Sequence, residues 1–301
     1  MASGALTQHT DALYQRNGQI FTHQTKISSI QLLSDLTPET QCLFNPLSER
    51  EHYVLSTIST IFHAQGGGQP SDTGIILLSS RPDIQFRVQQ VRRIGPAILH
   101  MGTFDPTGKI FEKDGDVEQR INVDERVMHS RIHTGGHVVG LAVNQLINSG
   151  TLSSNLVEGN ASHYPRASFV KFTGLIPAEA KAAIQAKVDK FVEQDLDVKI
   201  HFWSEEKARS NCTGMNGLLK GDKSGIRVVE IGDLGSYPCG GTHVSKLTWT
   251  SRSQATKTKP APPRSAGAQP REEVYSRDVN NQSGLIGLIG SNQSAHSIKP
   301  I

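Results

Sequence analysis

Long apolar runs, cysteine and net charge are all scarce in this sequence of 301 residues. The longest apolar stretches, such as Ile75–Leu78, fall far short of the ~20 residues that a membrane-spanning helix needs. Residues Met1–Arg16 lack the apolar core of a signal peptide and are poor in Arg, so we expect a cytoplasmic protein with no membrane partner. Three cysteines, Cys42, Cys212 and Cys239, are too few for a disulfide framework.

Charge is nearly balanced, and its small excess lies in one segment. The net charge is +3, of which residues 251–301 contribute +4 while the first 250 residues carry −1. Bulk charge therefore does not support a nucleic-acid partner, because such partners usually meet a basic domain. If RNA is bound, local groups such as Arg87, Arg92 and Arg93 must bind it, although three basic residues on one strand are more often a solvated face.

The first hundred or so residues have the pattern of short β-strands separated by turns. His52–Phe62 is rich in Val, Ile, Thr and Tyr, as strands tend to be. Gly74–Leu78 and Gln85–Ile94 resume the pattern after the glycine-rich stretch Gly66–Pro70. Several short strands without a convincing helix predict a small β-barrel domain over residues 1–115.

Helical and extended patterns interleave over residues 116–250. Apolar residues recur at helical spacing over Val127–Ile147, and a second helix is expected after Pro177. Strand-like segments cover 167–172, 197–203 and 226–231. Alternation in the second of these predicts that Phe202 points inward, with Val198 and Ile200. The interleaving predicts a two-layer α/β domain, so the fold class is α+β with an N-terminal barrel.

The composition changes again after residue 250. Residues 251–301 contain five prolines, many Ser, Gln, Thr and Gly, and one apolar island, Leu285–Ile289. Such a segment buries too little apolar area to offset the ordering of its backbone. We therefore expect a low-complexity, disordered tail.

Two pairs of metal-binding residue types occur at four-residue spacing. His133 and His137 lie on the predicted helix, where residues i and i+4 share a face ~5–6 Å apart, so both imidazoles can reach one ion. Cys239 and His243 enclose Gly-Gly-Thr, and glycine lets a tight loop bend round an ion. Three imidazoles and one thiolate match the ligands that zinc prefers. From the residues alone this is a candidate zinc site, with a core Cys239 and a surface His243 as the alternative.

The two motifs together resemble a known family pattern. His-Thr-Gly-Gly-His followed by Cys-Gly-Gly-Thr-His is similar to the HxxxH…CxxxH pattern of the editing domains of alanyl- and threonyl-tRNA synthetases. It is most similar to their free-standing relatives, the alanyl-tRNA editing proteins. Segments 62–74, 116–126 and 227–231 resemble neighbouring motifs of that family, so the resemblance spans roughly residues 50–247. Nothing in the chain resembles the aminoacylation machinery of a ligase.

The resemblance implies a hydrolase that deacylates mischarged tRNA(Ala) in translation, at an editing domain over residues 116–250. The ester removed would be that of serine, glycine or both, at the acceptor end of the tRNA. Water bound to Zn2+ would be the nucleophile, with no protein base assigned. Since four protein ligands close a zinc site, we expect one of them to be weak or displaced when substrate arrives. The implied metal ligands are His133, His137, Cys239 and His243, and the residues assigned to substrate binding are Gly66, Gly67, Gly68, Gln69, Asp72 and Thr134.

Two other functions stay open at this point. One is a metal-free tRNA editing hydrolase of the threonyl type, although Gly-Gly-Gly-Gln-Pro favours the alanyl branch. The other is a non-catalytic zinc module that binds RNA or protein. Family members normally continue with structured chain after the second motif, whereas here low-complexity sequence starts six residues after His243. If the missing strands belong to the core sheet, one sheet edge is left open.

Overall fold

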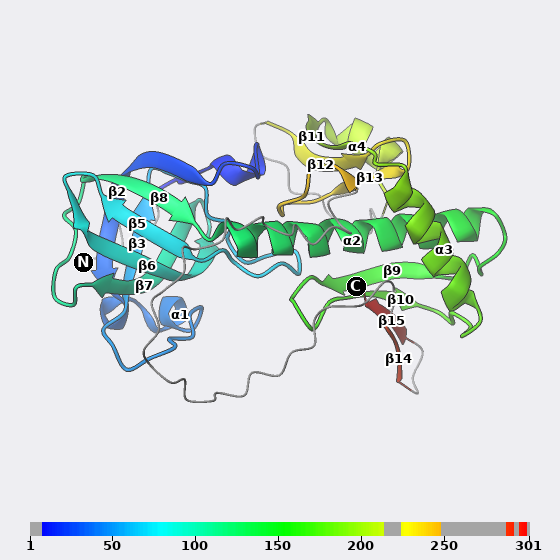
Figure 1. Ribbon diagram of the computed structural model, residues 1–301, viewed down its shortest axis with the longest axis horizontal. Helices are drawn as coiled ribbons and strands as arrows, with labels where there is room; N and C mark the ends of the chain where they lie inside the picture. The colour runs from blue at the N-terminus through cyan, green and yellow to red at the C-terminus, as the bar shows by residue number, and fades with distance from the viewer. Residues whose placement is uncertain (1–7, 214–223, 248–286, 292–294, 300–301) are drawn as a thin grey trace, which may run out of the picture.

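Six strands form a closed barrel in the N-terminal part of the chain (Figure 1). The computed structural model describes residues 8–213, 224–247, 287–291 and 295–299. The barrel order is β2-β3-β7-β6-β5-β8, and its interior is filled by apolar side chains such as Ile27, Ile76 and Phe86. The predicted barrel is therefore confirmed. Its strands are β2 (Thr22–Leu32), β3 (Tyr53–Thr57), β5 (Gly74–Leu78), β6 (Arg81–Ile94), β7 (Ala97–Asp105) and β8 (Asp116–Ile121).

The last barrel strand lies beyond the boundary that we predicted at residue 115. β8 pairs with β2 on one side and with β5 on the other. Without it both neighbours would have open edges, which proteins avoid. Segment 116–121, which we placed at the start of the second domain, is thus a strand of the barrel.

Short elements attach the N-terminal segment to the barrel. β1 (Asp11–Ala12) pairs in parallel with β4 (Ser59–Thr60) and leads into the short helix η2 (Leu13–Gln15). Two further short helices, η3 (Leu33–Asp35) and α1 (Pro38–Gln41), follow β2.

A single 26-residue helix, α2 (Val123–Asn148), leads out of the barrel and into the rest of the molecule. Its N-terminus is capped by the side chain of Asn122, which accepts a hydrogen bond from the backbone N–H of Glu125. Asp124 and Glu125 in the first turn also favour the positive end of the helix dipole. The helix predicted over Val127–Ile147 is thus confirmed, with one more turn at its start. No helix in the described part of the chain is long and apolar enough to cross a membrane.

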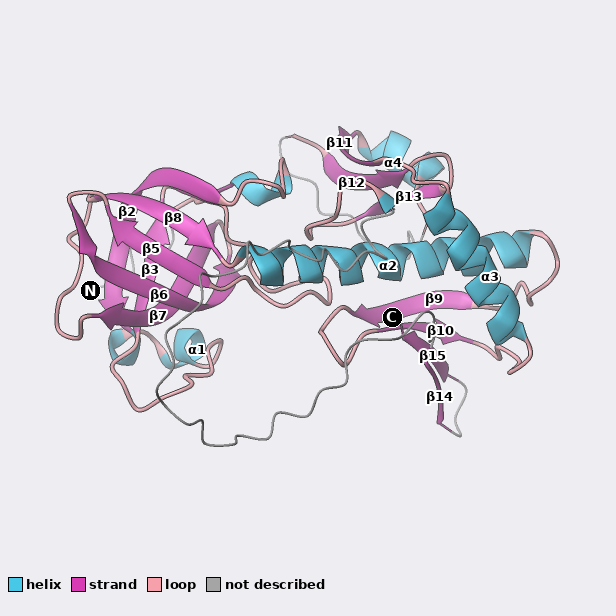
Figure 2. Ribbon diagram, viewed as in Figure 1, coloured by secondary structure: helices cyan, strands magenta, loops and turns pink. Residues whose placement is uncertain are grey.

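Helix α2 runs between two small sheets (Figures 1 and 2). One of its faces packs Val139 and Val143 against β10 and α3, and another packs Val138 and Leu141 against β11, β12 and β13. The helix is buried on both faces, because a sheet packs on each side of it. This arrangement differs from the two layers, one of helix and one of sheet, that we predicted. The surrounding elements are β9 (Val157–Ser162), β10 (Phe169–Thr173), α3 (Ala180–Glu193), β11 (Val198–Trp203), α4 (Glu205–Asn211), β12 (Ile226–Ile231) and β13 (Gly235–Pro238).

Two strands are present in the segment that we expected to be disordered. β14 (Gly287–Ser291) and β15 (Ala295–Lys299) pair with each other, and β15 pairs antiparallel with β10. They extend the sheet to β14-β15-β10-β9 and cover the edge of β10 that would otherwise be open. The pairing of β15 with β10 supplies backbone hydrogen-bond partners for this segment, and the amino-acid composition of the segment does not predict such a pairing. The rest of residues 251–301 lies outside the described residues.

Phe202 does not point into the core as predicted. Its side chain is 38% exposed, whereas that of its neighbour Trp203 is buried against Ala208 and Ile226. Trp203 packs in one cluster with Ala208 of α4, so the buried side of the strand changes at Trp203. Alternation in the sequence could not show which face another element would cover.

Candidate metal centre

The four predicted ligands meet at one place in the fold. His133 and His137 lie one turn apart on α2, while Cys239 and His243 lie in the loop after β13, the metal loop (residues 239–243). Their ligand atoms all lie within 4.8 Å of one another, and Cys239 Sγ is 3.3 Å from Nε2 of both His133 and His243. Zinc–ligand bonds of ~2.0–2.3 Å in a tetrahedron separate the ligand atoms by ~3.3–3.6 Å. The donor set therefore fits zinc, and the two sulfur–nitrogen distances match tetrahedral coordination.

Gln69 fixes the tautomer of His133. The backbone N–H of Thr242 donates to Gln69 Oε1 at 3.0 Å, so that atom is an acceptor. His133 Nδ1 lies 2.7 Å from the same oxygen and must carry the proton. The Nε2 of His133 is then left with a lone pair, directed toward Cys239. Gln69 acts as the supporting partner that metal-binding histidines usually have.

Thr134 fixes the tautomer of His243. Its hydroxyl donates its one proton to the carbonyl of Ser130 at 2.8 Å and accepts from the backbone N–H of Val244 at 3.3 Å. His243 Nδ1, 3.2 Å from the hydroxyl oxygen, must therefore be a donor. Two of the three histidines thus present unprotonated Nε2 atoms to a single point.

His137 supplies an unsatisfied nitrogen at the same point. Its Nε2 is buried and has no hydrogen-bond partner in the described part of the chain, while its ring stacks on Tyr237 at 4.5 Å. A buried polar atom without a partner is rare and costly. Burial lowers the pKa of His137 to about 3, so the ring is neutral and able to bind a cation.

Burial acts in the same direction on the other histidines and in the opposite direction on the thiol. It holds the pKa of His133 and His243 well below its ordinary value, with the neighbouring histidines adding to the effect. It also raises the pKa of the Cys239 thiol, which Arg227 partly offsets. A coordinated cation deprotonates a thiol, so a bound ion removes the penalty of burying this group.

The metal loop is held from two sides. Arg227 on β12 donates through Nη1 to the carbonyl of Cys239 and through Nε to that of Gln15 at 2.6 Å. Gln19, from the same N-terminal segment, donates to the carbonyl of His243 at 3.1 Å. Gly241 must be glycine, because a Cβ there would lie 2.4 Å from Nδ1 of His133. Nothing in the sequence predicted that residues 15–19 support this loop.

The glycine-rich stretch forms a tight turn against the second domain. Gly66 and Gln69 exchange backbone hydrogen bonds, and the central residues Gly67 and Gly68 have φ of +58° and +77°, which favours glycine. A Cβ on Gly68 would lie 2.5 Å from the carbonyl of Ala161. Gly66 and Gly67 are exposed at the tip of the turn, whereas Gln69 is buried beside His133. The turn thus brings exposed backbone close to the cluster.

Asp72 and Thr134 are buried, so neither side chain faces solvent as a substrate-binding role suggests. Both oxygens of the Asp72 carboxylate accept hydrogen bonds from Arg126, and one also accepts from the backbone N–H of His63 at 2.6 Å. The Thr134 hydroxyl is occupied by the bonds that position His243. These contacts give both residues supporting roles in the structure.

A fourth histidine, His163, lies against the cluster and was not predicted. Its ring stacks on that of His133 with centroids 4.0 Å apart, and its backbone N–H donates to the carbonyl of Gly68 at 2.8 Å. A Cβ on Gly136 would lie 2.4 Å from this ring. The only sequence signal for this contact was a glycine in the interior of the helix, between the two histidine ligands.

The chain was compared with known proteins, and no protein-family model matches it. An alanine–tRNA ligase from Pyrococcus abyssi is 28% identical over 240 residues, which are 73% of this chain and 24% of the ligase. The alanyl-tRNA editing protein AlaX-L from Pyrococcus horikoshii is 29% identical over 202 residues, which are 65% of this chain and 45% of that protein. A Pyrococcus furiosus alanine–tRNA ligase is 27% identical over 75% of this chain and 25% of its own length.

The chain therefore spans less than half the length of each of these relatives. The match to the ligases covers about a quarter of their length, so what they share with this chain is a segment rather than the whole enzyme. The resemblance that the two motifs predicted is confirmed: over 65–75% of its length, the chain is a homologue of the alanyl-tRNA editing protein AlaX-L and of one segment of the alanine–tRNA ligases.

Proposed function

We propose that this protein is an aminoacyl-tRNA deacylase that hydrolyses the ester of tRNA(Ala) mischarged with serine or glycine, acting in trans in the cytoplasm. The observation that carries the proposal is the buried cluster of three histidines and one cysteine, in a homologue of AlaX-L. The proposal names ester hydrolysis because one of the relatives, AlaX-L, is named an alanyl-tRNA editing protein.

The residues of the chain have separate parts in this proposal. His133, His137, Cys239 and His243 hold Zn2+, and Gln69 and Thr134 keep two of the imidazoles in the tautomer that leaves Nε2 free. Zn2+, when bound, supplies a Lewis acid that polarises an ester carbonyl and lowers the pKa of water.

Substrate contact falls to backbone rather than to side chains of the glycine-rich turn. Gly66 and Gly67 are exposed, and the turn that carries them is fixed to His133 through Gln69. We assign these two residues to the acylated end of the tRNA, since glycine lets a ligand approach the main chain closely. The partner is the acceptor end of tRNA(Ala), and no protein side chain is assigned as the base.

The test is hydrolysis of Ser-tRNA(Ala), Gly-tRNA(Ala) and Ala-tRNA(Ala) by the purified full chain. We expect release of serine or glycine that stops when a chelator removes zinc and returns when zinc is restored, with Ala-tRNA(Ala) spared. His137→Ala should abolish the activity, and Cys42→Ala, a change at an exposed cysteine, should leave it intact. Hydrolysis that a chelator does not affect would favour a metal-free editing enzyme. Binding of tRNA without hydrolysis would favour a binding module.

A further inference from the structure

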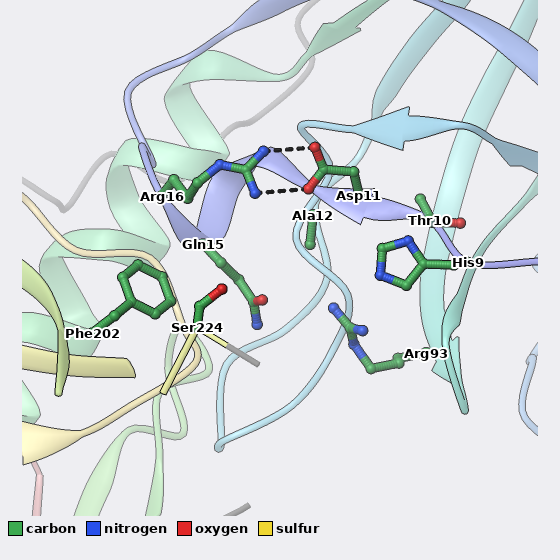
Figure 3. A pocket seen from close by; sticks show the side chains of 9 residues that line it. All are labelled: His9, Thr10, Asp11, Ala12, Gln15, Arg16, Arg93, Phe202 and Ser224. Atoms are coloured by element: carbon green, nitrogen blue, oxygen red, sulfur yellow. Dashed lines mark hydrogen bonds and ion pairs between the residues drawn. The ribbon is translucent and has the colours of Figure 1, made fainter. Parts of the chain in front are cut away.

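A pocket of about 240 Å³ lies beside the N-terminal segment (Figure 3). Its wall comes from the N-terminal segment, from the end of β6 and from β11, which contribute Gln15, Arg93 and Phe202 respectively. The carbonyl of Gln15 accepts from Arg227, and the same guanidinium donates to the carbonyl of Cys239. One side chain thus connects the pocket wall to the metal loop.

The charge of this pocket comes from Arg93. Of the three arginines that the sequence offered for RNA binding, Arg87 is paired with Asp105 at 2.6 Å, and Arg92 donates to backbone carbonyls and to a glutamine side chain. Arg93 is exposed and makes no side-chain hydrogen bond or ion pair with any described residue. The other guanidinium of the pocket, that of Arg16, is neutralised by Asp11 at 2.6 Å. Arg93 is therefore a cation without a charge partner among the described residues.

The pocket also has an exposed aromatic ring. Phe202 is the residue whose inward orientation the sequence predicted and the structure reverses, and its ring borders the pocket. Phe202 and Arg93 lie on opposite sides of the pocket (Figure 3). Proteins hold single-stranded nucleic acid with such groups, because bases stack on aromatic rings and phosphates meet cations.

We propose that this pocket binds one nucleotide of a single-stranded RNA 3′ end, with Arg93 on a phosphate and Phe202 stacked on a base. The proposal rests on the proposed function and says where a nucleotide preceding the esterified end lies. The volume is below the ~300–1,000 Å³ of sites for drug-sized ligands, which suits one nucleotide and not several. The amide of Gln15 adds a donor and an acceptor to the pocket, and a Cβ on Gly240 of the metal loop would lie 3.8 Å from its Nε2.

The experiment measures binding of an uncharged RNA hairpin with a single-stranded 3′-CCA end, by fluorescence anisotropy at several salt concentrations. The variants are Arg93→Ala and Phe202→Ala, with Arg87→Ala as the control, since Arg87 lies on the same strand but is already paired. We expect Phe202→Ala to weaken binding ~5- to 100-fold. Arg93→Ala should weaken it ~5-fold and reduce the salt dependence by about one phosphate contact. Arg87→Ala should change it less than ~2-fold.

A blunt hairpin without the single-stranded end should bind the wild type and Phe202→Ala equally. The proposal is overturned if Arg93→Ala binds the RNA like Arg87→Ala, or if Phe202→Ala binds it like the wild type. It is also overturned if Phe202→Ala weakens binding of the blunt hairpin as much as binding of the hairpin with the single-stranded end. Circular dichroism and zinc content confirm that each variant is folded. Failure of the proposed function is seen separately: a wild type that binds RNA in this way but deacylates nothing supports the pocket and overturns the deacylase.

Discussion

Two buried polar clusters differ in whether their groups have internal partners. In the first, Asp72 and Arg126 are each 1% exposed, and the guanidinium donates to the carboxylate and to the carbonyls of Gly18 and Ile61. In the second, the candidate metal centre, a nitrogen of His137 has no partner among the described residues. A buried polar group needs a partner, so the second cluster calls for a bound ligand, and the first does not.

The buried histidines of the two regions show the same contrast. His100 in the barrel and His137 in the cluster are both buried, and burial lowers their pKa to about 4 and about 3. In His100 both ring nitrogens have partners, the hydroxyl of Thr60 at 2.8 Å and the carbonyl of Leu55 at 3.1 Å. Burial alone therefore does not distinguish a candidate metal ligand from a structural histidine. Nor does a missing partner alone, since buried nitrogens of His52, His129 and His163 also lack partners among the described residues. What sets His137 apart is an unpartnered nitrogen within 4.8 Å of three other ligand atoms.

The largest effect is expected from breaking the complete cluster. Arg126→Met leaves the Asp72 carboxylate buried without its cation, which should lower the free energy of unfolding by ~3–5 kcal/mol. Urea denaturation measures the loss. The double variant Arg126→Met with Asp72→Leu should recover part of it, because it removes both charges. If Arg126→Met lowered the free energy of unfolding by less than ~1 kcal/mol, the Asp72 carboxylate would not need the guanidinium as its partner.

Acidification should weaken the barrel through His100. Its pKa of about 4 in the folded protein lies below the ordinary 6.5, so between these values the unfolded chain binds the extra proton. The contribution to stability is complete above pH 6.5 and is lost as the pH falls toward 4, by on the order of 3 kcal/mol. Urea denaturation at pH 7, 6 and 5 should show a shallower pH dependence for His100→Gln than for the wild type. Equal slopes would contradict the assignment.

Removing the support of His133 should weaken metal binding without removing a ligand. Gln69→Leu deletes the acceptor that fixes the tautomer of His133, which should reduce zinc affinity ~10- to 100-fold. Competition with a chromogenic chelator measures the affinity. Gln65→Leu, in the exposed part of the same loop, is the control and should bind zinc like the wild type. Equal affinity of the two variants would mean that Gln69 does not support the ligand.

The smallest effect is expected at Thr134. Thr134→Val keeps the shape of the side chain but removes the oxygen that accepts from His243 Nδ1, so zinc affinity should fall ~3- to 10-fold. The same competition assay detects this change. If Thr134→Val lost more zinc affinity than Gln69→Leu, Thr134 rather than Gln69 would be the more important support.

The sequence identified the four side chains that meet in one cluster, but not the residues that support them. Four-residue spacing indicates helix neighbours and tight loops, so the two ligand pairs could be found without the fold. The roles of Gln69, Asp72 and Thr134 could not be predicted from the sequence. A polar residue near glycines has the same sequence pattern whether its side chain faces a substrate or supports another side chain of the protein. His163 and the support from Gln15 depend on contacts between distant segments, which no local pattern records.

The fold shows the same division between local and distant information. The barrel strands and α2 follow from periodicity. The pairing of the closing strand β8 and the outward orientation of Phe202 instead depend on which elements cover the sheet edges and the faces of β11. Such choices are made by tertiary packing, and propensity and alternation do not contain them.

Zinc content measured on purified wild type and His137→Ala tests the central claim most directly. We predict one zinc per chain in the wild type and none in His137→Ala at equal secondary structure by circular dichroism, since His137 has the nitrogen without a partner among the described residues. A wild type that binds no zinc when zinc is supplied, or a variant that keeps its zinc, would contradict the account.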